Sequence, residues 1–153
     1  MNKYYESKEG QLFVDPILAN HVGLTEITQE QFNQIIADRN KPTTDQLLQR
    51  LTQARKEQET QGVTLNDIRY AGDPGNRQAL QEAIAFMDDA GLTEFPKWKD
   101  SDDEFHVDHL LSDVFDAYRA VGMRRVALIA AEGQYAAQIA AGTLTDLSEV
   151  VWP

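Results

Sequence analysis

The residues with the clearest chemical potential lie between Asp102 and His109, in the sequence DDEFHVDH. Carboxylates beside an imidazole can hold a divalent metal ion or share a proton, which is the chemistry of a metal-dependent hydrolase. On an extended strand, His106 and Asp108 would point to the same side, with Glu104 beside them. The candidate metal ligands of this run are therefore His106, Asp108 and His109.

A structural interpretation of the same run is simpler. An acidic turn that leads into a helix explains the aspartates, because negative charge is favourable near a helix N-terminus. The spacing of His106 and His109 is also too short for the two-histidine metal motif of helices. We favour the structural interpretation and expect no catalytic residue, no cofactor and no bound metal. The metal-dependent hydrolase remains as a distant alternative.

Two other segments have residues that an anion-binding site could use. The sequence DPGNR at 73–77 precedes a predicted helix, and a helix N-terminus attracts phosphate. It lacks the lysine and the second glycine of a P-loop, so we interpret Asp73 as a helix cap. Arg124 and Arg125 form a basic pair, which we expect to make salt bridges with the acids at 100–104 or to lie along a helix edge.

The composition limits the classes of partner. The 153 residues include 14 lysines and arginines against 25 aspartates and glutamates, a net charge of −11. Phosphate binding needs clustered cations, so we expect neither nucleic acid nor a membrane surface as the main partner. The chain has no cysteine, which excludes disulfides and thiolate metal sites. There is no signal-peptide pattern and no apolar run of transmembrane length, so we expect a cytoplasmic protein.

Hydrophobic periodicity and turn residues predict an α+β fold in three segments. Residues 1–42 form a β-hairpin with a turn at Gly10, a third strand at 24–28 as an option, and a helix capped by Thr28. Residues 43–61 form a polar connector helix with one apolar patch. Residues 62–153 form a ββαββα domain that ends in a long helix.

The domain at 62–153 begins with a small hairpin that turns at Asn66 and Asp67. A helix with a buried apolar face follows, with Asp73 as its cap, Pro74 in its first turn and Gly91 after its end.

A second hairpin then turns at 100–103, with Trp98 and Phe105 on its two arms as expected core residues. Asp108 is the expected cap of the longest helix, and Gly122 is a position where that helix could break or kink.

This order of elements resembles a family of uncharacterised domains found at the C-terminal ends of phage and prophage tail proteins. The likeness covers roughly residues 50–135. It rests on the polar helix ARKEQETQG, the strand GVTLN, the segment DPGNRQAL, the pair Trp98–Lys99 and the aromatic Phe105. The family often has Asp-Gly where this chain has residues 101–103, which leaves the geometry of the second hairpin turn open.

The N-terminal segment has a likeness of its own. A short aromatic hairpin followed by LTEITQEQ is similar to the openings of tail-fibre assembly proteins. Together the two resemblances imply a non-enzymatic assembly chaperone that binds a tail-fibre or baseplate protein in the host cytoplasm. The alternative that they imply is a structural component that stays in the virion tail. No residue pattern predicts an oligomeric state.

The expected partner-binding residues are Tyr4, Tyr5 and Phe13. Three aromatic side chains in so small a hairpin can pack on the following helix, around Phe32 and Ile35. So small an N-terminal segment cannot bury all three rings, so we expect an exposed aromatic patch that binds protein. A sheet edge that accepts a partner strand would serve the same end.

Overall fold

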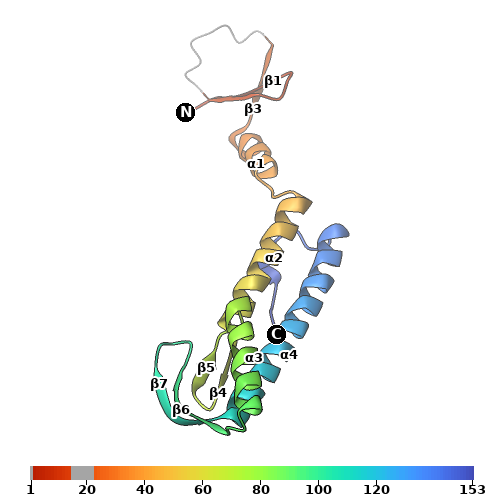
Figure 1. The fold of residues 1–153 in the computed structure, drawn as a ribbon. Coiled ribbons are helices and arrows are strands. Elements are labelled where there is room, and N and C mark those ends of the chain that lie inside the picture. Colours follow the sequence, from red (N-terminus) through yellow and green to blue (C-terminus); the bar gives the residue numbers. More distant parts are fainter. Residues whose placement is uncertain (1, 15–22) are drawn as a thin grey trace. The chain divides into compact units, whose positions relative to one another are not determined.

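The computed structural model describes residues 2–14 and 23–153, which form two compact units, Met1–Thr43 and Thr44–Pro153 (Figure 1). The fold is α+β, as the sequence predicts. No helix in the described residues is both long enough and apolar enough to cross a membrane.

The N-terminal unit contains β1 (Tyr4–Ser7), β2 (Leu12–Val14), β3 (Leu24–Ile27) and α1 (Gln29–Arg39). The second unit contains α2 (Thr44–Gln61), β4 (Val63–Leu65), β5 (Ile68–Tyr70), α3 (Pro74–Asp89), β6 (Glu94–Lys99), β7 (Phe105–Leu110), α4 (Leu111–Ala140) and a 3-10 turn (Leu147–Glu149).

The N-terminal unit is an antiparallel sheet of three strands followed by a helix. The strand order is β2-β1-β3, so the optional third strand is present and pairs Tyr4 with Ile27. Thr28 and Gln31 form the predicted capping box at the start of α1, in which each side chain bonds the backbone N–H of the other. Arg39, in the last turn of α1, donates a hydrogen bond to the backbone oxygen of Gly10 in the hairpin turn.

The second unit is organised along α4 (Figure 1). Helix α2 packs along the C-terminal part of α4, and α3 packs along its N-terminal part. Each part has its own hydrophobic core. The core under α3 and the hairpins consists of Tyr70, Leu80, Val114, Ala117 and Val121. The core under α2 consists of Leu47, Leu51, Ile139 and Leu144, with the C-terminal Trp152 against it. The helix expected as a connector therefore belongs to the second unit.

Two antiparallel hairpins complete this unit. In the β4–β5 hairpin, Asn66 and Asp67 have left-handed φ values of 51° and 63°, as a two-residue turn requires. The β6–β7 hairpin pairs Trp98 with His106 and turns at 100–104. Trp98 packs against the core, as expected. Phe105 does not, because its side chain is 66% exposed and lies under the ammonium groups of Lys97 and Lys99.

Two expectations about α4 are wrong. Asp108 does not cap the helix, since β7 continues to Leu110 and the helix begins at Leu111 without a side-chain cap. Gly122 does not interrupt it either, because α4 is one helix of 30 residues. Apolar packing on both sides of the glycine outweighs the cost of about 1 kcal/mol that a glycine adds to a helix interior.

Candidate functional site

The histidines of the β6–β7 hairpin face the protein interior. Asp108 has a left-handed φ of 50°, which breaks the simple alternation of side chains along β7. As a result His106 and His109 lie on the core side, opposite Trp98 and Phe95, while Asp108 is exposed. The expectation that His106 and Asp108 share one side of the strand is therefore wrong.

His109 is paired with a buried tyrosine. Its Nε2 lies 2.8 Å from the hydroxyl of Tyr70, and the exposed fractions of the two residues are 5% and 3%. Burial lowers the pKa of His109 and raises the pKa of Tyr70 to about 12. Both side chains are therefore neutral at pH 7, and each gives the other a hydrogen-bonding partner inside the core. The pair stabilises the fold.

His106 stabilises the hairpin turn. Its Nε2 lies 2.9 Å from Oδ2 of Asp100, whose Oδ1 accepts the backbone N–H groups of Asp102 and Glu104. The hydrogen bond from His106, together with those backbone donors, lowers the pKa of Asp100. Within residues 2–14 and 23–153, no three histidine, aspartate or glutamate side chains are arranged to hold a metal ion. The two histidines that suggested chemistry in the sequence therefore have structural partners, whereas Asp108 is exposed.

A buried carboxylate in α2 is a feature that the sequence did not reveal. Glu59 is 8% exposed and forms a salt bridge with Arg55 one turn earlier. Its oxygens also lie 3.6 Å from Arg77 of α3 and 3.4 Å from Arg125 of α4. The sequence predicts only a polar connector helix here, because the partners of Glu59 on α3 and α4 are distant in sequence.

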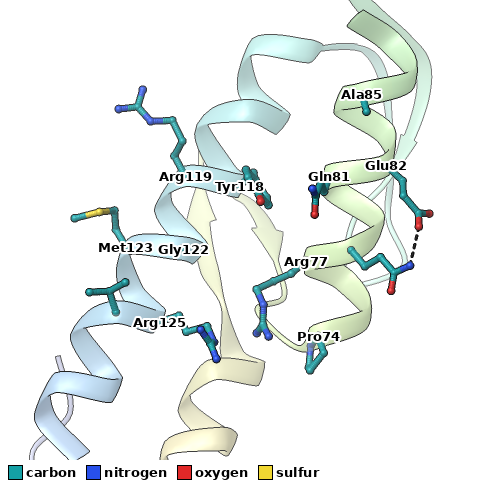
Figure 2. Close-up of a pocket in the computed structure, with 12 residues that line it drawn as sticks. Pro74, Arg77, Gln81, Glu82, Ala85, Tyr118, Arg119, Gly122, Met123 and Arg125 are labelled. Atoms are coloured by element: carbon teal, nitrogen blue, oxygen red, sulfur yellow. Dashed lines mark hydrogen bonds between the residues drawn. The ribbon is translucent and has the colours of Figure 1, made fainter. Parts of the chain in front are cut away.

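Arg124 and Arg125 do not pair with the acids at 100–104. Arg125 reaches Glu59, and Arg124 donates a hydrogen bond to the side chain of Gln58. The segment 73–77 is a helix cap, as interpreted: Asp73 accepts the backbone N–H groups of Gly75 and Asn76. The arginine that ends the segment, Arg77, points along α3 toward Arg125 (Figure 2).

Arg77 and Arg125 border a groove between α3 and α4 with a volume of about 1060 Å³ (Figure 2). Arg77 and Arg125 lie at the end near Pro74, while Tyr118 and Gln81 lie between the two helices. The lining residues are Pro74, Arg77, Gln78, Gln81, Glu82, Ala85, Tyr118, Arg119, Gly122, Met123, Arg125 and Val126. The lining includes three arginines and one glutamate, and the buried Glu59 offsets part of the charge of Arg77 and Arg125, which leaves a small positive excess in a chain whose net charge is −11.

The groove is also apolar where α4 borders it. Met123 is 71% exposed and Val126 is 63% exposed, although both lie in the middle of the longest helix. Phe115, one turn before Arg119 on α4, is 46% exposed, and its ring lies 6.0 Å from the guanidinium carbon of Arg119. Exposed apolar side chains that gather along one surface, rather than singly, are typical of a protein-binding site.

The aromatic residues expected to bind a partner are mostly used inside the N-terminal unit. Tyr5 is 6% exposed, and the ring of Tyr4 packs 4.8 Å from that of Phe32 in α1. Phe13 is half-buried opposite Tyr5 in the sheet. Among the described residues of this unit, none of the three is a fully exposed aromatic side chain. The edges of the sheet, β2 and β3, remain the more accessible candidates there.

Comparison with known proteins places most of the chain in one family. Residues 42–151 match the model of a domain of unknown function, DUF4376, so the chain belongs to that family. The match begins two residues before α2 and includes both cores of the second unit. No curated protein and no solved structure matches the chain.

Proposed function

We propose that this chain is a non-enzymatic protein-binding component of a phage or prophage tail, and that it acts as an assembly chaperone for a tail-fibre protein. The observation that carries the protein-binding part is the α3–α4 groove, where Met123, Val126 and three arginines are accessible on one surface. Such a mixture of apolar area and arginine is what protein interfaces are enriched in.

The tail context rests on sequence resemblance. The likeness over residues 50–135 lies within the range of the DUF4376 match, and the N-terminal sequence that resembles fibre-assembly proteins forms β3 and the start of α1. A chaperone for a fibre must cover apolar surface until the fibre assembles, and an acidic chain keeps such a complex soluble. The groove offers the apolar contacts, and the net charge of −11 offers the solubility.

The experiment that tests this function compares particles with lysate. The full chain is co-expressed with a tail-fibre protein of the same phage or prophage, and purified particles and infected-cell lysate are both analysed by quantitative mass spectrometry. A chaperone co-purifies with the fibre and is absent from particles. A fixed copy number in particles would establish the alternative, a structural tail component. Absence from particles together with failure to bind any tail protein would contradict both.

A further inference from the structure

The walls of the α3–α4 groove have the spacing of a helix-binding site. On α3 the lining positions are 77, 78, 81, 82 and 85, and on α4 they are 118, 119, 122, 123, 125 and 126. Positions three and four apart recur on both walls, so each wall presents ridges and grooves one helical turn apart. None of the residues that line the groove belongs to a strand, so it offers no edge for a partner strand. A third helix is the element that fits two such walls.

We propose that the α3–α4 groove binds a helix of a partner protein, and that this helix carries acidic side chains beside a face of small and apolar residues. The proposal rests on the protein-binding function proposed above and states the chemistry of the partner. It makes Arg77, Arg119 and Arg125 the residues that select the partner, and Met123 and Val126 the apolar contacts.

The acidic character of the partner follows from the charges already present. Glu59 and Glu132 are the two carboxylates that serve three guanidinium groups: Arg55 contacts both, whereas Arg77 and Arg125 have Glu59 alone as an ion-pair partner among the described residues. The distances from Glu59 to Arg77 and Arg125, 3.6 and 3.4 Å, are longer than those of a charge-assisted hydrogen bond. Figure 2 shows these two arginines pointing to the same end of the groove. A carboxylate from a partner can therefore bind both without displacing Glu59.

The third arginine extends the positive charge along α4. The contact described for Arg119 is with the ring of Phe115, 6.0 Å from the guanidinium carbon, and the described residues include no ion pair to it. Arg119 lies about 1.7 turns before Arg125 on the same helix, and Figure 2 shows its side chain pointing away from α3. A partner helix would therefore meet Arg119 and Arg125 with different acidic residues.

The small and apolar face of the partner follows from Gly122. A Cβ atom at this position would meet nothing within 4 Å, so internal packing does not require glycine there. A glycine in the interior of a helix is nevertheless unfavourable compared with alanine. Its position in the groove, next to the exposed side chain of Met123, allows the backbone of a partner to approach closely. We therefore place the closest approach of the two helices at Gly122.

A panel of three labelled peptides tests this proposal with the full-length chain. Each has about 18 residues, which spans about 27 Å as a helix. The first is helical, with alanine and leucine on one face and glutamates along the flank. The second replaces the glutamates by lysines. The third is the first peptide with two internal residues replaced by proline, which prevents it from forming a helix. Fluorescence anisotropy should detect binding of the first peptide, with at least about tenfold weaker binding of the other two.

The methionine methyl groups report where the peptide binds. In a sample labelled at these methyl groups, the signal of Met123 should shift on titration, because its side chain is 71% exposed in the groove. The signal of Met87 is an internal control, because that side chain is 3% exposed in the core and should stay unchanged. A shift of Met87 without a shift of Met123 would contradict the proposed site.

Matched variants separate the groove from general electrostatics. Arg125→Glu should weaken binding of the acidic peptide by about tenfold or more, whereas Arg50→Glu, the same charge change at an exposed position of α2, should not. Met123→Asp should likewise weaken binding, whereas Val151→Asp at another exposed apolar position should not. Equal binding of the acidic and the basic peptide, no binding of any peptide, or equal effects of the groove and control variants would overturn the proposal.

Two further outcomes distinguish this proposal from the proposed function and from self-association. If the fibre protein co-purifies with the chain and Arg125→Glu does not reduce that, the function stands and the groove proposal fails. If the acidic peptide binds as expected but no tail protein co-purifies, the groove proposal stands and the tail function fails. Light scattering of the free chain gives its mass. A dimer that Met123→Asp dissociates would mean that a second copy fills the groove, which would overturn the proposal.

Discussion

The region around the two hairpins and the α3–α4 groove contain the same kinds of residue. Around the hairpins these residues bind partners within the chain, whereas in the groove some of them have no such partner among the described residues. Between the two hairpins, Arg69 of β5 donates to the carboxylate of Asp102 and to the backbone oxygen of Ser101, both in the β6–β7 turn. In the groove, Arg119 contacts an aromatic ring, and the described residues offer it no carboxylate. One arginine is satisfied by its own chain and the other is available to another molecule.

Glycines differ between these two regions in the same way. A Cβ atom at Gly62 would overlap the carbonyl oxygen of Tyr70, and one at Gly72 would overlap the carbonyl oxygen of Glu59. These glycines allow the end of α2 and the end of β5 to lie backbone against backbone. Gly122 faces open space in the groove. The comparison shows that residue type alone does not identify a functional site. A residue is a candidate for binding another molecule when contacts within its own chain do not account for it.

The largest predicted effect breaks the glycine contact under the hairpins. Gly62→Ala should lower the free energy of unfolding by more than about 3 kcal/mol, because a φ of 69° is strained for alanine and the methyl group meets the Tyr70 carbonyl. Urea unfolding followed by circular dichroism measures the loss.

Gly91→Ala is the matched control for that substitution. Gly91 has a similar φ of 66°, but a Cβ atom there would meet nothing within 4 Å. Its substitution should therefore cost only the backbone strain, about 1–2 kcal/mol. Equal losses for the two variants would show that the close backbone approach at Gly62 does not contribute.

A smaller effect is expected from the buried histidine under the hairpins. The pKa of His109 is lowered from 6.5 by burial, and the nearby His106 adds to this while Asp113 opposes it. The unfolded state therefore binds more protons than the folded state below pH 6.5. Stability that is fully present above pH 6.5 should be lost as the pH falls toward the lowered pKa, with a slope of at most about 1.4 kcal/mol per pH unit for one proton.

His109→Gln isolates this contribution. The amide can still form a hydrogen bond with the Tyr70 hydroxyl, but it does not titrate. The free energy of unfolding, measured by urea titration between pH 5 and pH 7, should depend less on pH in the variant than in the parent chain. Identical slopes would mean that protonation of His109 does not oppose folding.

Local signals predicted much of the fold. The side chains of Thr28 and Asp73 cap α1 and α3 as expected, and Asn66 and Asp67 form the expected turn. Each of these signals acts within four residues, so the sequence contains all the information that is needed. The start of α4 was missed because Leu110 precedes the helix without a side-chain cap. The polar Asp108, two residues earlier, is the better cap by type, but it takes a left-handed conformation inside a strand.

The candidate site could not be predicted in the same way. The groove requires α3 to lie along α4, and the burial of Glu59 requires arginines from both of those helices. Residue type directed attention to the acidic hairpin turn, where His106 and His109 proved to have internal partners. The only signal for the groove in the sequence was the apolar pair Met123 and Val126 beside two arginines, in a helix that also packs on α2. That signal cannot be interpreted until the buried face of α4 is known.

The smallest predicted effect is a gain in stability at the groove. Gly122→Ala should raise the free energy of unfolding by about 0.5–1 kcal/mol, because alanine favours the helix and its methyl group would meet no other atom within 4 Å. Gly133→Ala is the matched variant on the same helix outside the groove, where a Cβ atom also meets nothing. Urea unfolding should give similar gains for both.

Binding should separate the two variants that stability does not. If a partner helix approaches most closely at Gly122, an added methyl group would hold that helix away. Gly122→Ala should therefore weaken binding of the acidic peptide, while Gly133→Ala should leave its affinity unchanged. If Gly122 lowers the stability of the free protein and strengthens the complex, its role is in binding. Equal affinities for the two variants would instead leave Gly122 without a role in binding, and the charge of the arginines would then have to account for partner selection alone.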